Sequence, residues 1–295
     1  MGRSLYSDRS DASSTIFLLS SGRSGSTWLG SMLHSLPETR MIFEPFHAGR
    51  GIPSLAAHRY FHISAEADNG DLAAGVRRLL TKSSWNPWVE QFNPAAQFVY
   101  RRRLLKEVRI NLLLPWLLGR FSDCRFVLLL RHPAAVVQSQ VSGGWLLSPD
   151  RLYGQPGLGR LPWVQDLKKL DSSDEAFERN LLFWAIENRI ALDAATAAGI
   201  PVMLYEELCV EPEAQLAGLE RYLDTAFLPA ATEGAAEASW SSSKSVADYS
   251  LEQKISSWQT RILPGQMTAM LRILEASGLN SVYGRESMPV ASGLG

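Results

Sequence analysis

The chain has 295 residues, of which 46% are hydrophobic, and its formal net charge at pH 7 is −1. A chain of this length and composition can bury a sizeable core, either as one large α/β domain or as a domain with a long insertion. The near-neutral balance provides no general basic field, which argues against nucleic acid or an anionic membrane as a partner. The run Arg101–Arg103 is a local exception. It is either solvated, which we favour for its first two residues, or it attracts an anionic ligand.

No segment of the sequence has the pattern of a targeting or membrane-spanning element. The first fourteen residues are polar and mixed in charge, and the apolar stretch after them is too short for a signal-peptide core. Residues 112–118 contain Pro115 and fall far short of the ~20 residues that a membrane helix needs. Cys124 and Cys209 are expected to be buried thiols, and no Cys/His spacing indicates a metal site. We therefore expect a cytoplasmic protein with no membrane span and no bound metal.

Apolar runs and helical periodicities alternate along the chain. We expect strands near residues 15–20, 41–44, 103–107, 125–130 and 201–205. We expect helices near residues 25–36, 71–81, 110–119, 133–142, 174–198, 212–223, 251–258 and 264–276. The clearest of these is 174–198, in which Phe177, Leu181 and Trp184 recur at helical spacing and Gly199 ends the pattern. The alternation predicts a three-layer α/β fold, with a mainly parallel central sheet flanked by helices.

Three segments rich in Gly, Pro and Trp, residues 46–70, 82–100 and 143–170, are predicted to be loops. Aromatic rings in such loops can stack on a sugar face or line an apolar pocket. Ordinary packing is the better expectation for any single one of them. As a group, these rings predict that the loops at about 46–100 and 143–170 bind a substrate; they are Trp85, Trp88, Trp145 and Trp163.

The most informative stretch lies between the first expected strand and the first expected helix, from Ser20 to Trp28. Its two glycines permit a tight turn, in which backbone N–H groups and the positive end of the helix face one spot. The side chains add hydroxyl donors and one guanidinium, which suit phosphate or sulfate oxygens. The stretch is therefore a candidate anion site, although Ser/Gly-rich turns also occur where nothing binds.

This loop differs from the nucleotide-triphosphatase loop, G-x-x-x-x-G-K-[ST], at one position. Ser26 follows Gly25, where that loop has a lysine for the outer phosphates. The chain can still bind phosphate, but it lacks the usual means of handling a triphosphate with magnesium.

The loop resembles the 5′-phosphosulfate loop of sulfotransferases that use 3′-phosphoadenosine 5′-phosphosulfate (PAPS), in the R-S-G-S-[ST] form of the carbohydrate and bacterial branches. Residues 125–140 look like that family's 3′-phosphate motif, an apolar strand that ends in R-[DH]-P and precedes a helix with a serine. Pro133 suits the first turn of this helix. Arg131 and Ser139 can approach each other if the helix folds back over the carboxyl end of the strand, where α/β sheets bind ligands. Two such motifs in this order favour a nucleotide site over a solvated arginine.

Three further segments resemble the family at lower specificity. Lys106 and Arg109 match a K-x-x-R element, which implies that Lys106 neutralises bridging or sulfuryl oxygens; Arg109 either helps or only pairs with a carboxylate. Residues 205–208 are similar to the Y-E-[DE]-L that ends the last core strand, with a largely structural role. Residues 240–274 resemble the C-terminal segment that closes over the nucleotide. There the resemblance assigns Lys244 to the 3′-phosphate or the adenine, although a lone lysine in a Ser-rich loop is more often solvated.

Sulfuryl transfer to an alcohol needs a group that accepts the hydroxyl proton and positive charge on the departing phosphate. Arginine, lysine and backbone amides can supply that charge without a metal. Glu44 ends the second expected strand and resembles the F-E-P of carbohydrate sulfotransferases, in which a glutamate is taken as the base. His47 competes with it, because an imidazole titrates near neutrality. We prefer Glu44; the structural alternatives are a loop-bracing carboxylate and an ordinary loop histidine.

The resemblance implies one sulfotransferase domain over residues 1–295, with a P-loop nucleotide-kinase-like fold. It implies transfer of a sulfuryl group from PAPS to a hydroxyl of a small-molecule, carbohydrate, lipid-like or natural-product acceptor, in an oligomeric state that stays open. The expected catalytic residues are Arg23, Glu44, His47 and Lys106. The expected PAPS-binding residues are Ser21, Gly22, Arg23, Ser24, Gly25, Ser26, Thr27, Trp28, Arg131, Ser139 and Lys244. The alternatives are a nucleotide-triphosphate-dependent kinase, which would require a strand-end aspartate for magnesium, and a nucleotide-binding module without catalysis.

Overall fold

The computed structural model describes residues 7–8, 11–81, 86–93, 99–171, 175–227 and 250–290. Its central sheet has five strands in the order β3-β5-β2-β6-β7, and every neighbouring pair is parallel. A second, two-stranded sheet pairs β1 with β4. The strands are β1 (Ser7–Asp8), β2 (Thr15–Ser20), β3 (Thr39–Phe43), β4 (Val99–Tyr100), β5 (Arg102–Glu107), β6 (Arg125–Leu130) and β7 (Val202–Leu204).

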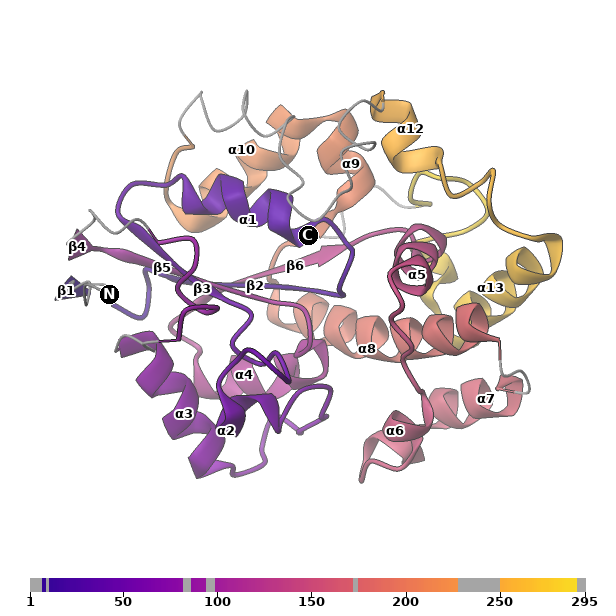
Figure 1. Cartoon of the computed structure of the whole chain (residues 1–295), viewed down its shortest axis with the longest axis horizontal. Coiled ribbons are helices and arrows are strands. Elements are labelled where there is room, and N and C mark those ends of the chain that lie inside the picture. Colours follow the sequence, from indigo (N-terminus) through magenta and orange to yellow (C-terminus); the bar gives the residue numbers. More distant parts are fainter. Residues whose placement is uncertain are drawn as a thin grey trace.

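Helices cover both faces of the central sheet, which gives the three layers that Figure 1 shows. One face carries α1 (Ser26–His34), α9 (Tyr205–Val210) and α10 (Pro212–Leu223). The other face carries α3 (Gly70–Thr81), α4 (Leu114–Arg120) and α8 (Ala176–Ala198). The remaining helices are α2 (Pro53–Ala56), α5 (Pro133–Ser142), α6 (Asp150–Tyr153), α7 (Pro162–Leu170), α12 (Leu251–Ser256) and α13 (Pro264–Ser277). The 3-10 turns are η1 (Asn111–Leu113), η2 (Leu158–Arg160) and η5 (Leu279–Ser281).

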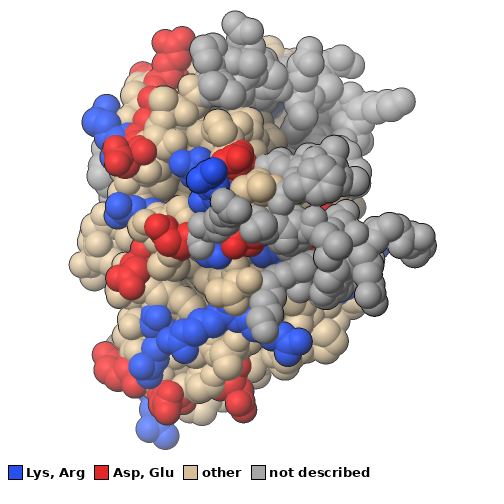
Figure 2. Space-filling model, turned by 90° about the vertical axis from the view of Figure 1, so that its left-hand side faces the viewer, with Lys and Arg blue, Asp and Glu red and all other residues tan. Residues whose placement is uncertain are grey.

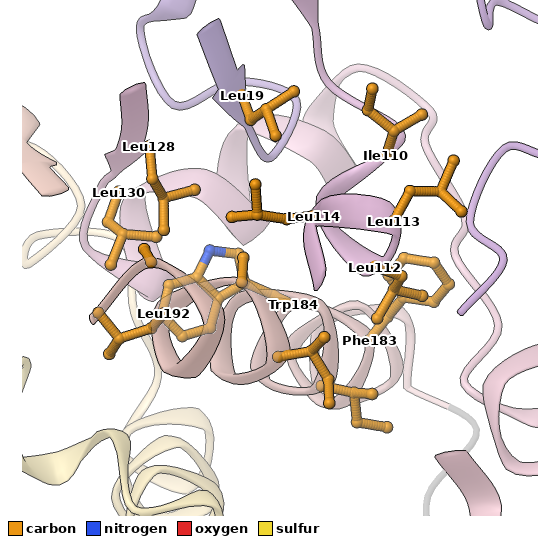
Figure 3. Packing of buried hydrophobic residues seen from close by; sticks show 14 of the residues in the cluster. Leu19, Ile110, Leu112, Leu113, Leu114, Leu128, Leu130, Phe183, Trp184 and Leu192 are labelled. Atoms are coloured by element: carbon orange, nitrogen blue, oxygen red, sulfur yellow. The ribbon is translucent and has the colours of Figure 1, made fainter. Parts of the chain in front are cut away.

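Side chains of the strands alternate between two buried apolar clusters, one on each face of the sheet. In β2, Leu18 joins the cluster under α1, and Leu19 joins the cluster that includes α8. Figure 3 shows Leu19 and Leu128 on the strand side of this second cluster, with Trp184 of α8 opposite them. Because both faces are covered, strands of continuous apolar sequence are stable here, as the sequence predicted.

The β3 edge of the sheet is closed by the segment 86–93. The backbone N–H of Met41 donates to Oδ1 of Asn93, Nδ2 of Asn93 donates to the Met41 carbonyl, and both distances are 2.8 Å. The N–H of Phe43 donates to the Val89 carbonyl at 2.9 Å. These contacts satisfy backbone groups that an open edge would expose. They also fix the carboxyl end of β3, after which Glu44 follows.

The structure confirms the predicted fold class and places the five central strands within two residues of their expected bounds. The prediction of loops was wrong in part, because α2, α6 and α7 lie in segments 46–70 and 143–170, and β4 lies in segment 82–100. Pro162 was read as a loop signal, yet it occupies the first turn of α7, where a missing N–H is harmless. The segment 205–208 was expected to end a strand, but Tyr205 begins α9.

The other sequence-wide expectations concern thiols, membrane spans and charge. Cys124 and Cys209 are buried free thiols, as expected, and burial raises the pKa of each to about 11. Among the described helices, none is long and apolar enough to cross a membrane. On the face shown in Figure 2, acidic and basic side chains lie among one another.

Candidate active site

The loop between β2 and α1 makes a turn that its glycines permit. Gly25 has a φ of 89° and Arg23 a φ of 77°, both in the left-handed region that L-residues seldom adopt. A Cβ atom at Gly25 would lie 2.5 Å from a ring carbon of Tyr205, and one at Gly22 would lie 2.3 Å from a ring carbon of Trp145. The loop therefore runs directly beneath two aromatic rings, which only glycine allows.

The loop offers hydrogen-bond donors of the kind that an anion needs. Ser26 and Thr27 open α1, where helix geometry leaves the first N–H groups without a carbonyl partner. The hydroxyl of Ser24 is buried, and no partner for it exists within the described residues. The indole N–H of Trp28 is likewise buried and has no partner there. Free donors beside a helix N-terminus fit a phosphate or sulfate group.

The two sequence motifs meet through Arg23. Its Nε donates to Oγ of Ser139 on α5 at 2.8 Å, and Nη1 of Arg131 donates to its carbonyl oxygen at 3.1 Å. Arg131 and Ser139 were predicted to lie close together, and both of them contact Arg23 of the loop. Burial, and then the charge of Arg131, lower the pKa of Arg23. Because two neighbouring guanidinium groups repel each other, an anion bound between them would be stabilised.

Tyr205 connects the same elements from above the loop. The guanidinium carbon of Arg131 lies 4.2 Å from the centre of its ring, and Trp28 packs edge-on against it at 5.7 Å between centroids. From the sequence, this segment was expected to have a largely structural role. The sequence signal for Tyr205 as a site residue was its position as an aromatic residue directly after the last strand, at the sheet edge where ligands bind. We refer to Arg23, Arg131, Ser139 and Tyr205 as the arginine cluster.

A second charged group lies at the carboxyl ends of β3 and β5. Nζ of Lys106 is 2.5 Å from Oε1 of Glu44, and Nη1 of Arg109 is 2.8 Å from Oε2 of the same carboxylate. Burial alone would raise the pKa of Glu44, but the two cations outweigh it and hold this pKa below its usual value. Glu44 is therefore ionised at neutral pH, with both oxygens in ion pairs. We refer to these three residues as the glutamate cluster.

Glu107 supports the backbone around this cluster. It is fully buried, and its carboxylate accepts from the N–H of Phe46 at 2.7 Å and from Nη1 of Arg109 at 3.2 Å. Glu44 itself has a φ of 41°, a strained value for a residue with a side chain. The turn after β3 is thus held against its own preference, which is typical of functional positions.

His47, the competing base, lies beside Glu44 in a defined tautomer. Its Nδ1 accepts from the N–H groups of Gly49 at 3.1 Å and Arg50 at 3.2 Å, so the proton of the neutral ring is on Nε2. Burial, followed by the charge of Arg109, lowers the pKa of His47. A neutral ring with this tautomer is a donor at Nε2, and it must rearrange before that nitrogen can accept a proton.

The predicted loop tryptophans have different positions. Trp145 packs on Gly22, and the guanidinium carbon of Arg109 lies 5.9 Å from its ring centre, so it links the candidate anion loop to the glutamate cluster. Trp88 packs against His47 at 5.2 Å between ring centroids. Trp163 packs on the hydrophobic core. Trp85 lies outside the described residues.

Of the residues expected to bind PAPS, one has another hydrogen-bond partner and one is not described. The hydroxyl of Ser21 faces away from the loop surface, since it donates to Oε1 of Glu187 at 2.5 Å. Lys244 lies outside the described residues. The arginine run has structural partners, because Arg101 pairs with Glu38 at 2.6 Å and Arg103 is buried in an ion pair of 2.9 Å. In the described part of the chain, no group of three or more His, Cys, Asp or Glu side chains is placed to hold a metal ion.

The chain resembles several solved structures. No family model and no curated protein matches the chain. Among solved structures, the sulfotransferase domain of the Synechococcus PCC 7002 olefin synthase has 17% sequence identity and a TM-score of 0.50, over 95% of this chain and 96% of that one. The sulfotransferase domain from the curacin biosynthetic pathway has 19% identity and a TM-score of 0.44, over 88% and 95%. Mouse sulfotransferase SULT7A1, solved with PAP, has 14% identity and a TM-score of 0.46, over 92% and 86%.

At these identities the likeness concerns the fold. The chain therefore has the fold of the olefin synthase sulfotransferase domain, and the predicted sulfotransferase architecture is confirmed. That domain is a sulfotransferase domain, and the two motifs resemble the sulfotransferase family.

Proposed function

We propose that this protein is a PAPS-dependent sulfotransferase that acts on a hydroxyl of a small-molecule, carbohydrate, lipid-like or natural-product acceptor. The observation that carries the proposal is the arginine cluster, in which Arg23 contacts both Ser139 and Arg131 at the carboxyl edge of a parallel sheet. Ligands of open α/β sheets bind at this edge. The sulfotransferase fold of the chain supports the same reading.

The residues present fit a nucleotide with two phosphate groups. Nε of Arg131 and the hydroxyl of Ser24 are buried without partners in the described part of the chain, which leaves two donors for phosphate oxygens. In the proposal, residues 22–28 hold the 5′-phosphosulfate, while Arg131 and Ser139 hold the 3′-phosphate. Lys244 is proposed for the same nucleotide. PAPS, when bound, supplies a sulfuryl group attached to a good leaving phosphate.

The glutamate cluster supplies the proton chemistry in this proposal. Glu44 is ionised and accepts the proton of the acceptor hydroxyl, and Lys106 provides positive charge close to the loop. A carboxylate with a lowered pKa is a weak base. Its strength suffices because the hydroxyl proton becomes acidic as its oxygen bonds to sulfur. Arg109 holds the second oxygen of Glu44 and so fixes its direction.

The acceptor is proposed to enter between the two clusters. Trp145 lies against both the loop and Arg109, and Trp88 and His47 stand beside Glu44. Aromatic walls of this kind suit a sugar face or an apolar chain. The cytoplasmic location and the absence of a metal requirement stay predictions.

A thermal melt with nucleotides tests this proposal directly. Adenosine 3′,5′-bisphosphate (PAP), added with a chelator, is expected to raise the melting temperature, because a ligand that binds only the folded state stabilises it. ATP with magnesium is expected to have a smaller effect. A larger shift with ATP and magnesium than with PAP would instead support the kinase alternative.

A further inference from the structure

A cluster of buried polar groups lies behind the candidate anion loop, where no ligand would reach it. Oγ of Ser21 donates to Oε1 of Glu187 at 2.5 Å, and Nδ2 of Asn188 donates to the same hydroxyl at 2.8 Å. Nδ2 of Asn111 donates to Oδ1 of Asn188 at 3.2 Å. All four side chains are at most 2% exposed. The first turn of the loop is thus tied to the middle of α8.

Glu187 lacks the partners that a buried carboxylate normally has. Within the described residues it makes no ion pair, and its Oε2 has no hydrogen-bond partner. One hydroxyl donor does not compensate for the loss of water around a charge. Burial therefore raises the pKa of Glu187 to about 8, even though the Ser21 hydroxyl and the charge of Arg109 lower it. At neutral pH most molecules carry an uncharged Glu187.

Few charged groups act on this carboxyl. Arg109, after β5, is the cation in its surroundings, and Tyr60, in the segment before α3, has its own pKa raised in part by Glu187. From η1 and from α8 itself, the neighbouring groups are the neutral amides of Asn111 and Asn188. The buried side chains on the other elements packed on α8 are apolar or neutral, among them Leu117 of α4, Val137 and Gln140 of α5 and Met270 of α13.

Ser21 is well placed to pass the state of Glu187 to the loop. Its carbonyl accepts from the N–H of Ser24 at 3.3 Å, so it begins the turn that gives Arg23 its left-handed conformation. Ionisation of Glu187 would place a negative charge directly behind the site proposed for an anion. Binding of an anion and ionisation of Glu187 therefore oppose each other.

We infer that Glu187 is a positioning residue for the donor: in its uncharged form it holds Ser21 and the loop ready for the 5′-phosphate, and in its ionised form it opposes binding. The inference rests on the proposed function, because it takes this loop as the donor site. It predicts that donor affinity falls as the solution becomes alkaline. A merely structural Glu187 would leave that pH profile unchanged.

The test is calorimetric titration of the full chain with PAP from pH 7.5 to 9.5, where phosphate monoesters are already fully ionised. For the wild type we expect the Kd to rise about fivefold or more over this range, because Glu187 loses its proton there. For Glu187→Gln, a neutral isostere, we expect a flat profile and a Kd at pH 7.5 within about threefold of the wild type. The matched control, Glu178→Gln on the same helix, should follow the wild type.

A second variant tests the coupling from the loop side. Ser21→Ala removes the hydroxyl and leaves Glu187 in place, so we expect weaker binding at pH 7.5 and a shallower pH profile. A Glu187→Gln profile as steep as that of the wild type, or a flat wild-type profile, would overturn the inference while leaving the donor site intact. If PAP binds none of these proteins at any pH, the proposed donor site itself is wrong.

Discussion

The arginine cluster and the glutamate cluster occupy neighbouring strand ends of one sheet, yet they differ in how their charge is balanced. In the glutamate cluster, Lys106 and Arg109 are paired with the carboxylate of Glu44 at 2.5 and 2.8 Å. In the arginine cluster, Arg131 makes no ion pair within the described residues and lies close to a second guanidinium. The first group carries its own anion, and the second is suited to receive one. The proposed function therefore places proton chemistry in the glutamate cluster and donor binding in the arginine cluster.

The topology explains why two such groups stand side by side. β3 and β5 are neighbours, and the residues after them build the glutamate cluster. β2 and β6 are neighbours as well, and the residues after them build the arginine cluster. Because β5 also pairs with β2, the two groups share one sheet edge. Trp145 then joins them from outside the sheet.

The largest expected effect is a loss of turnover without a loss of donor binding, caused by a change in the glutamate cluster. Glu44→Gln should lower kcat by ~10²-fold or more, as loss of a general base does, and should leave the affinity for PAP unchanged. Steady-state turnover and calorimetry measure the two quantities. Normal turnover by this variant would remove Glu44 as the base, and a loss confined to His47→Ala would assign the role to His47.

The next effect falls on donor binding. Arg131→Ala should weaken PAP binding by ~30- to 100-fold, because a charge-assisted contact to a phosphate is lost. Arg101→Ala, which removes an exposed arginine between β4 and β5, is the matched control and should bind normally. Equal affinity of the two variants would contradict the placement of the 3′-phosphate at Arg131.

A smaller effect is expected from the shape of the loop. Gly25→Ala should weaken PAP binding by about tenfold and lower stability, because φ is 89° and the new Cβ would meet Tyr205. Gly49→Ala, where a Cβ meets nothing within 4 Å, is the control. In the double variant with Tyr205→Ala, the added loss from Gly25→Ala should be smaller than in the wild-type background, and a fully additive result would show that the ring does not constrain the loop.

The last effect lies outside both clusters and concerns stability and its dependence on pH. Glu187 holds its proton more tightly in the folded chain than in the unfolded one, so its contribution becomes less favourable as the pH rises from about 4.5 to about 8. Glu187→Gln should therefore be more stable than the wild type by roughly 4 kcal/mol at pH 7.5, and by only about 1 kcal/mol at pH 5. Urea denaturation at the two pH values measures this. A constant difference would mean that folding does not raise the pKa of Glu187.

The fold was predictable from sequence because its signals are local. Apolar runs of β-branched and leucine residues marked the five strands, and Gly199 marked the end of α8. α7 was missed because Pro162 and the glycines before it obscured a short amphipathic pattern in which only Val164 and Leu167 are buried.

The site was predictable where a motif is contiguous and not where it is assembled by packing. The candidate anion loop and Arg131 were predicted from sequence, and the structure brings them into contact through Arg23. The sequence left open whether Arg109 helps to neutralise sulfuryl oxygens or only pairs with a carboxylate, and the structure shows it paired with Glu44. Tyr205 and Glu187 were missed as site residues, because each contacts the loop only after distant segments pack together. A polar pair at positions 187–188 in a largely apolar stretch of α8 was the available signal for Glu187.

The central claim is that one cluster binds a sulfuryl donor and the other activates a hydroxyl. Its most direct test incubates the protein with radiolabelled PAPS and a host metabolite extract in the presence of a chelator, and identifies the labelled product by mass spectrometry. We expect a labelled product with the wild type, and we expect it to be lost with Glu44→Gln and with Arg131→Ala. A protein that binds PAP but yields no labelled product from any extract, or that transfers label only from ATP with magnesium, would contradict it.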